Sequence, residues 1–201
     1  MTPRLFWTAV AGAASALAVV LTIAVAELPK HTSTGNGTGQ AQLSQAQAQA
    51  LLAGSPPALA SLHARGGELL AAGAGAWQAQ LRALRGLPLV VNKWASWCVP
   101  CQGERAIFQR AAANWGRRVA FVGIDSGDSG RGDAQAFLRV TPMSYPSFYD
   151  SSGALGREVT GSPFTPVTLF LTSGGSRYPH QGPYTSVAAL ERDIERYAVG
   201  A

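Results

Sequence analysis

The two cysteines are the residues whose type and spacing most directly indicate chemistry. Cys98 and Cys101 are the only cysteines among 201 residues, and two residues separate them. A disulfide between them would close a very small loop, and the stabilisation that a disulfide gives grows with loop length. A domain held together by structural disulfides would carry more cysteines at wider spacings. The pair therefore indicates thiol–disulfide exchange rather than structural cross-linking.

The surrounding sequence predicts that Cys98 lies at the beginning of a helix. The apolar run 87–94 is typical of a buried strand, and residues 98–115 have a helical pattern, with Pro100 suited to the first turn. Free N–H groups and the helix dipole stabilise a thiolate at such a position. We therefore expect Cys98 to be the nucleophile that attacks a partner's disulfide. Cys101, one turn further along, would resolve the mixed disulfide.

A metal site is the alternative that a cysteine pair always raises. Zinc needs about four ligands, and His31, His63 and His180 show no ligand spacing relative to the cysteines. The segment 125–133 holds three aspartates but lacks the spacing of a calcium loop, so we expect a solvated loop there. The sequence predicts no metal and no cofactor beyond the redox-active disulfide Cys98–Cys101.

The N-terminal segment predicts attachment to a membrane. Residues 5–26 are uncharged and overwhelmingly apolar, and Arg4 precedes them. About 20 such residues match the thickness of a bilayer core, and positive charge stays on the cytoplasmic side. We expect a short cytoplasmic N-terminus (1–4), a transmembrane signal-anchor helix (5–26), and a single-pass protein whose catalytic domain is extracytoplasmic. Ala24–Ala26 also fits a signal-peptidase site, so cleavage stays open; both interpretations export the domain.

The segment that follows the predicted anchor has the composition of a flexible linker. Within residues 27–54, the stretch 31–39 is rich in Thr, Ser, Gly and Asn, which cannot form a core, and an Ala- and Gln-rich stretch compatible with a helix follows it. We expect a flexible extracytoplasmic linker over 27–54 and a globular domain over 55–201.

Within the globular part, strand and helix patterns alternate. This alternation indicates an α/β domain with a central β-sheet flanked by helices, and a Gly-rich turn at 173–175 predicts a hairpin that makes the sheet mixed. The patterns predict strands at 87–94, 118–125, 146–149 and 167–172, and helices at 77–84, 98–115, 133–140 and 187–197.

The segment Val90–Cys101, which ends in Trp-Cys-Val-Pro-Cys, resembles the active-site segment of the thioredoxin superfamily. Its anchored, exported form resembles the TlpA/ResA-like branch. The resemblance runs from about Leu84 to the C-terminus and implies a thioredoxin fold and disulfide reduction outside the cytoplasm, often in cytochrome c maturation. Three residues depart from the pattern. Ala106 stands where related helices often carry a kinking Pro, so we expect a straighter helix. Asn92 stands where thioredoxins often carry a buried Asp, and Lys93 replaces an apolar residue, so we expect its amine to reach solvent.

Glu104 is the candidate proton-transfer group. It falls on the same helical stripe as Cys101, Phe108 and Trp115, which is otherwise apolar. A partly buried carboxyl there would have a raised pKa and would exchange protons with Cys101. The TlpA/ResA-like branch carries a Glu three residues after its second active-site cysteine, and Glu104 matches it. An exposed helical glutamate is the alternative.

Trp97, Thr165 and Pro166 are the candidate substrate-binding residues. Thr165-Pro166 directly precedes the strand predicted at 167–172. The resemblance implies that Pro166 is a cis proline that faces the cysteines and lets the preceding backbone pair with a substrate strand. The residues alone leave an ordinary trans proline open. Trp97, next to Cys98, is expected to form an apolar rim for partner docking, with local packing as the alternative.

These features favour an extracytoplasmic thiol–disulfide oxidoreductase that reduces partner disulfides, such as those of apocytochrome c, with electrons from a transmembrane thiol donor. Val99-Pro100 does not fix the redox potential, so a disulfide-forming oxidase stays open. A non-catalytic binding module that kept the fold is the third interpretation. The net charge of +5 is scattered and forms no basic stripe with interleaved aromatics, so no nucleic-acid partner is expected.

Overall fold

The computed structural model describes residues 42–200. The predicted segments 1–4 and 5–26 lie outside this range, as does most of the predicted linker 27–54. Among the described residues, no helix is both long enough and apolar enough to cross a membrane.

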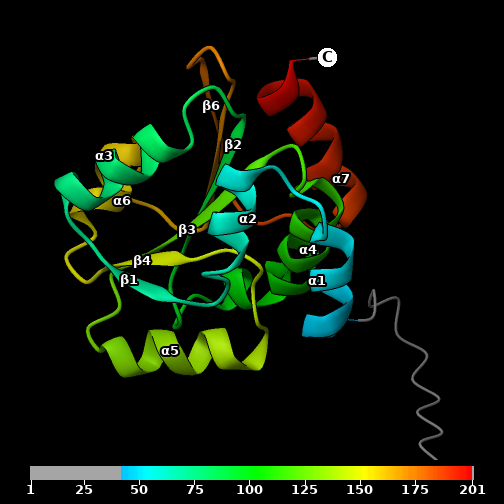
Figure 1. The fold of residues 1–201 in the computed structure, drawn as a ribbon. Helices are drawn as coiled ribbons and strands as arrows, with labels where there is room; N and C mark the ends of the chain where they lie inside the picture. Colours follow the sequence, from blue (N-terminus) through cyan, green and yellow to red (C-terminus); the bar gives the residue numbers. More distant parts are fainter. Residues whose placement is uncertain (1–41, 201) are drawn as a thin grey trace, which may run out of the picture. The chain divides into compact units, whose positions relative to one another are not determined.

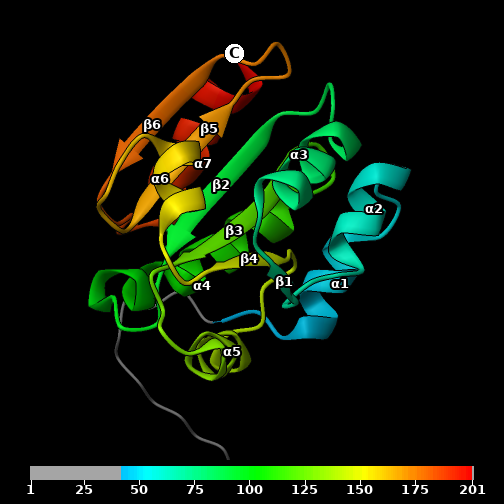
Figure 2. The same cartoon turned by 90° about the vertical axis from the view of Figure 1, so that its left-hand side faces the viewer.

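A six-stranded sheet forms the centre of the domain (Figures 1 and 2). Its strands are β1 (Leu69–Ala71), β2 (Leu89–Trp94), β3 (Ala120–Ser126), β4 (Ser147–Asp150), β5 (Val167–Leu171) and β6 (Arg177–Gln181). They lie in the order β1-β4-β3-β2-β5-β6, with the first four parallel. β5 pairs antiparallel with both β2 and β6. The predicted mixed sheet is confirmed, and β2, which leads into the cysteines, lies inside it.

Helices cover both faces of the sheet. They are α1 (Gln45–Leu52), α2 (Pro57–His63), α3 (Ala74–Ala83), α4 (Val99–Trp115), α5 (Arg131–Val140), α6 (Ala154–Thr160), α7 (Val187–Asp193) and a π-helix, η1 (Ile194–Val199). α3 and α6 lie on one side of the sheet, and α4 and α7 lie on the other (Figures 1 and 2). The predicted helix 187–197 is thus present, but its last turns are π-helical.

The strand β2 shows why the sequence folds this way. All six of its residues are buried, as expected for a central strand covered on both faces. Val90 and Trp94 point into the core under α4, whereas Leu89 and Val91 join the core on the opposite face. The expectation for Lys93 is wrong: its side chain is buried, and its Nζ donates to the Ser162 carbonyl at 2.7 Å.

The end of the predicted linker is part of the domain. Ser44 caps α1, and the Leu43 N–H donates to Gln109 Oε1 on α4 at 2.9 Å. Leu43 and Ala48 are buried in one small cluster with Ala113. The predicted boundary at residue 55 is therefore wrong, because alternation of Gln with Ala and Leu gives α1 an apolar face that packs on α4.

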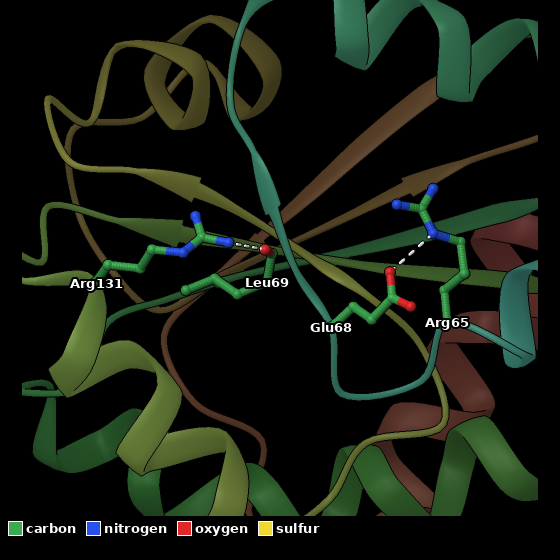
Figure 3. A network of polar contacts seen from close by, with 4 residues as sticks. All are labelled: Arg65, Glu68, Leu69 and Arg131. Atoms are coloured by element: carbon green, nitrogen blue, oxygen red, sulfur yellow. Dashed lines mark hydrogen bonds and ion pairs between the residues drawn. The ribbon is translucent and has the colours of Figure 1, made fainter.

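Three short elements, α2, β1 and α6, were not predicted from the sequence. β1 has only three residues and pairs with β4 at the edge of the sheet. Figure 3 shows how its surroundings hold it: Arg131 of α5 donates to the Leu69 carbonyl, and Arg65 pairs with Glu68 at 3.0 Å just before the strand. The Arg65–Glu68 pair is half-exposed, so it contributes little stability.

Candidate active site

Cys98 lies where β2 turns into α4. β2 ends at Trp94, and Cys98 is the N-cap of α4, with extended backbone angles and Pro100 in the first turn. The Cys98 sulfur accepts a hydrogen bond from the Cys101 N–H at 3.2 Å. The two cysteines form a disulfide. The predicted placement at a helix start is confirmed, and the same N–H would stabilise a Cys98 thiolate once the disulfide is reduced.

The surface around Cys98 is apolar and open. Trp97, Val99 and Phe164 are 61%, 73% and 69% exposed, respectively. Trp97 is also fixed in place, since its indole N–H donates to the Gly127 carbonyl at 3.3 Å. Trp97 is therefore not packed into the core, which favours its interpretation as a rim residue. Exposed large apolar side chains grouped at one place are typical of a surface that contacts another molecule.

Thr165 and Pro166 are distant from the cysteines in sequence but lie beside them in the structure: 64 residues separate Thr165 from Cys101. The Thr165–Pro166 peptide bond is cis, the geometry that the resemblance implied. Thr165 Oγ1 lies 3.9 Å from the Cys101 sulfur and donates to the Lys93 carbonyl at 3.2 Å. The segment before β5 is therefore tied to β2 and borders the disulfide. The binding of a substrate strand at this position stays a prediction.

Glu104 is buried directly behind the cysteines. Only 1% of it is exposed, so the alternative of an exposed helical glutamate is wrong. Its Oε2 accepts a hydrogen bond from the Tyr184 N–H at 3.0 Å, and its Oε1 has no hydrogen-bond partner among the described residues. Desolvation raises the pKa of Glu104 to about 8, although the Tyr184 N–H acts in the opposite direction. A carboxyl with this pKa can both take up and release a proton near neutral pH.

Two aspartates of the loop expected to be solvated are buried instead. Asp128 accepts hydrogen bonds from the Ser96 N–H at 3.0 Å and the Ser96 hydroxyl at 2.9 Å, and so fixes the turn that leads into Cys98. Asp125, at the end of β3, is fully buried, and its pKa is raised to about 9, mainly by desolvation and then by Asp128. The expectation of a solvated loop is wrong for these two residues.

A further polar group behind Cys101 was also missed by sequence reasoning. Asn92, Arg105 and Tyr145 share a small cavity with Cys101. Asn92 and Tyr145 are buried, and Arg105 is half-buried. The one available signal was Asn92, a polar residue inside an apolar strand. Nothing in the sequence pattern links Arg105 or Tyr145 to it.

The chain has relatives among the thiol:disulfide interchange proteins. It is 35% identical over 101 residues to the thiol:disulfide interchange protein DsbE of Yersinia pestis, covering 48% of this chain and 50% of the relative. The match to DsbE of Escherichia coli K12 is also 35% identical, over 103 residues, or 49% and 51% of the two chains. The chain thus spans about half the length of the curated relatives it matches. No protein-family model matches it.

Solved structures of similar proteins share the fold. The structure of MTB DsbF has a TM-score of 0.53 and 27% identity, covering 58% of this chain and 84% of that one. A DsbF homologue from Corynebacterium diphtheriae has a TM-score of 0.52 and 25% identity, covering 57% and 74%. The mixed sheet, the Cys98–Cys101 disulfide at the start of α4 and these similarities together show a thioredoxin-like fold that is similar to that of thiol:disulfide interchange proteins.

Proposed function

We propose that this protein is an extracytoplasmic thiol–disulfide oxidoreductase that reduces disulfides in partner proteins. The observation that carries the proposal is the asymmetry of the cysteine pair. Both cysteines are buried, but Cys98 caps a helix between the exposed Trp97 and Val99. Cys101 lies one helical turn before the buried Glu104, whose pKa is raised to about 8. One sulfur is thus placed to meet a partner, and the other to act with a proton acceptor nearby.

The first step forms a mixed disulfide. In the reduced protein, the Cys98 thiolate attacks one sulfur of a partner's disulfide, and the partner's S–S bond breaks. The other partner sulfur leaves as a thiolate and takes a proton from solvent. The N–H of Cys101, which lies 3.2 Å from the Cys98 sulfur, stabilises the attacking anion.

The second step releases the partner. The Cys101 thiol passes its proton to the Glu104 carboxylate, and the resulting thiolate attacks the Cys98 sulfur. The bond between Cys98 and the partner breaks, and the partner's second sulfur leaves as a thiolate. Two electrons have then moved to the partner, and Cys98 and Cys101 end as a disulfide. A transmembrane thiol carrier would supply the electrons that reduce this disulfide again.

The location and the partner rest on the sequence. The apolar segment 5–26 behind Arg4 supports a membrane anchor with the domain outside the cytoplasm. The resemblance to the TlpA/ResA-like branch supports apocytochrome c as a substrate. The location is tested by fractionating cells that make the full chain and adding protease from outside. The proposal expects a membrane-bound chain whose domain is digested; a chain in the cytosolic fraction would contradict it.

The direction of electron flow is tested by titrating the protein in glutathione redox buffers. A reductant should equilibrate near the potential of thioredoxin, about −270 mV, whereas a strong oxidant such as DsbA lies near about −120 mV. A value near the latter would make the protein a disulfide-forming oxidase. The binding-module alternative is tested with Cys98→Ser, which would leave partner function normal if no thiol chemistry were involved.

A further inference from the structure

A small cavity lies behind Cys101, on the inner side of the disulfide. Asn92, Cys101, Arg105 and Tyr145 contribute to its wall, and apolar side chains such as Phe137 and Met143 complete it. The space open to the centre of a water molecule is about 10 Å³. A volume of this size holds one water molecule, provided that two to four polar groups surround it.

Three polar atoms of these residues lack a protein partner. Asn92 Oδ1, Arg105 Nε and the Tyr145 hydroxyl are buried, and none has a hydrogen-bond partner among the described residues. The side chains of Asn92 and Tyr145 lie close enough to interact, but neither Asn92 Oδ1 nor the Tyr145 hydroxyl has a partner with hydrogen-bond geometry among the described residues. Buried polar groups are almost always hydrogen-bonded, to protein or to ordered water. Polar groups that line one cavity and are not directly hydrogen-bonded can be bridged by a water molecule.

Two contacts hold the Arg105 guanidinium beside the cavity. Its Nη2 donates to the Phe137 carbonyl at 2.8 Å, and the guanidinium lies 4.2 Å from the centre of the Phe137 ring. These contacts satisfy Nη2 and cover one face of the guanidinium. Its buried Nε–H has no hydrogen-bond partner in the described range 42–200.

We propose that one water molecule binds in this cavity and donates a hydrogen bond to the Cys101 sulfur. The donors and acceptors match a tetrahedral water: the Arg105 Nε–H and the Tyr145 O–H donate to its oxygen, and Asn92 Oδ1 accepts one of its hydrogens. The second hydrogen points to the sulfur. Asn92, Arg105 and Tyr145 are thus positioning residues that act on Cys101 through the water.

The consequence for catalysis rests on the proposed function. In the second step, Cys101 gives its proton to Glu104 and becomes an anion before it attacks Cys98. The bound water, polarised by the Arg105 charge, stabilises that anion. Glu104 lies outside the wall of the cavity, so the proton acceptor and the water are separate groups that act on the same sulfur.

The kinetic test uses 5,5′-dithiobis(2-nitrobenzoate) with the reduced full chain. Attack by Cys98 releases one coloured thiolate, and resolution by Cys101 releases a second, so stopped-flow absorbance separates the two steps. Tyr145→Phe is expected to slow the second phase about tenfold at pH 7, as for loss of a hydrogen bond to a charged group. It should move the pH midpoint of that phase upward and leave the first phase unchanged.

Two further variants keep the kinetic test informative. Asn92→Leu keeps the size of the side chain but removes the acceptor, so it should slow the same phase. Tyr178→Phe makes the matched change at a half-exposed tyrosine on β6 and should alter neither phase. Equal second phases in the wild type, Tyr145→Phe and Asn92→Leu would overturn the role of the water in catalysis.

Crystal structures of the wild type and Tyr145→Phe test the site itself. The wild type should show density for one water within hydrogen-bond distance of Asn92 Oδ1, Arg105 Nε and the Tyr145 hydroxyl. A cavity without such density, or one closed by direct contact between the three groups, would overturn the proposal. A wild-type protein that releases no thiolate would instead overturn the proposed function, and diffraction would still decide the water site.

Discussion

The two sides of the Cys98–Cys101 disulfide are opposite in character. On the outer side, Trp97, Val99 and Phe164 expose large apolar surfaces. On the inner side, Glu104 is buried one helical turn after Cys101, and Asn92 and Tyr145 are buried at a cavity that Cys101 also lines. This reverses the usual distribution of apolar and polar side chains in a folded protein. The reversal separates two tasks: the outer side is suited to contact a partner, and the inner side to control the protonation of a sulfur.

Removing the inner carboxyl should have the largest effect. Glu104→Gln keeps the shape of the side chain but cannot accept a proton, so we expect the resolution step to slow about 100-fold. The wild-type resolution rate should rise with pH through about 8, the pKa of Glu104, and this inflection should be absent in the variant. Stopped-flow kinetics between pH 6 and 10 measure both. Glu195→Gln, at an exposed position of η1, is the control, and an equal loss in the control would contradict the assignment.

The same carboxyl should make stability depend on pH. Because burial raises the pKa of Glu104 from 4.5 to about 8, the folded protein keeps a proton that the unfolded chain releases. The contribution of protonated Glu104 to stability is therefore fully present below the pKa of the unfolded chain. It is lost as the pH rises through the pKa of the folded protein. Between pH 5 and pH 8, we expect the wild type to lose up to about 3 kcal/mol more than Glu104→Gln in urea titrations. Parallel losses in the two proteins would mean that Glu104 is not protonated when folded.

A substitution of Asp128 tests whether the turn before Cys98 holds that cysteine in place. Asp128→Asn replaces a carboxylate that accepts two hydrogen bonds from Ser96 with an amide. We expect a loss of about 2 kcal/mol in unfolding free energy and a slower first phase, because Cys98 is held less firmly. Asp133→Asn, at an exposed position of α5, is the matched control. A first phase and stability equal to those of the control would show that the turn does not need Asp128.

The outer rim should give the smallest effect, and only with large partners. Trp97→Ala is expected to lower kcat/KM about fivefold for a protein disulfide, since exposed tryptophans often anchor interfaces. Rates with a small aromatic disulfide should stay the same, because such a molecule does not need the rim. Val140→Ala removes a comparably exposed apolar side chain elsewhere. Equal losses for the small and the large substrate would place Trp97 in the chemistry rather than in docking.

Local sequence patterns were enough to predict the strand–turn–helix that carries the cysteines. The apolar run before Cys98 and the helical spacing after it are properties of neighbouring residues, and they place Cys98 at the start of α4. The same periodicity placed Glu104 on a stripe with Phe108 but left an exposed glutamate open, and the resemblance favoured the buried one. The cis bond at Pro166 came from the resemblance and not from the residues alone.

The supporting polar groups could not be predicted because distant segments bury them. Asp128 lies in a Ser- and Gly-rich loop that reads as solvated, yet it is fixed by Ser96, 32 residues earlier. The buried amine of Lys93 donates a hydrogen bond to a backbone carbonyl 69 residues later in the sequence. Such contacts depend on the packing of the sheet and its helices. Sequence periodicity describes one element at a time, so it does not report them.

The central claim is that Cys98 meets the partner while Cys101 acts from inside. It is tested most directly by producing Cys101→Ser in the native host and isolating mixed disulfides under denaturing, non-reducing conditions, with Cys98→Ser as the control. The account predicts that Cys101→Ser accumulates adducts joined through Cys98 and that Cys98→Ser accumulates few or none. Equal trapping by both variants, or trapping only through Cys101, would contradict it.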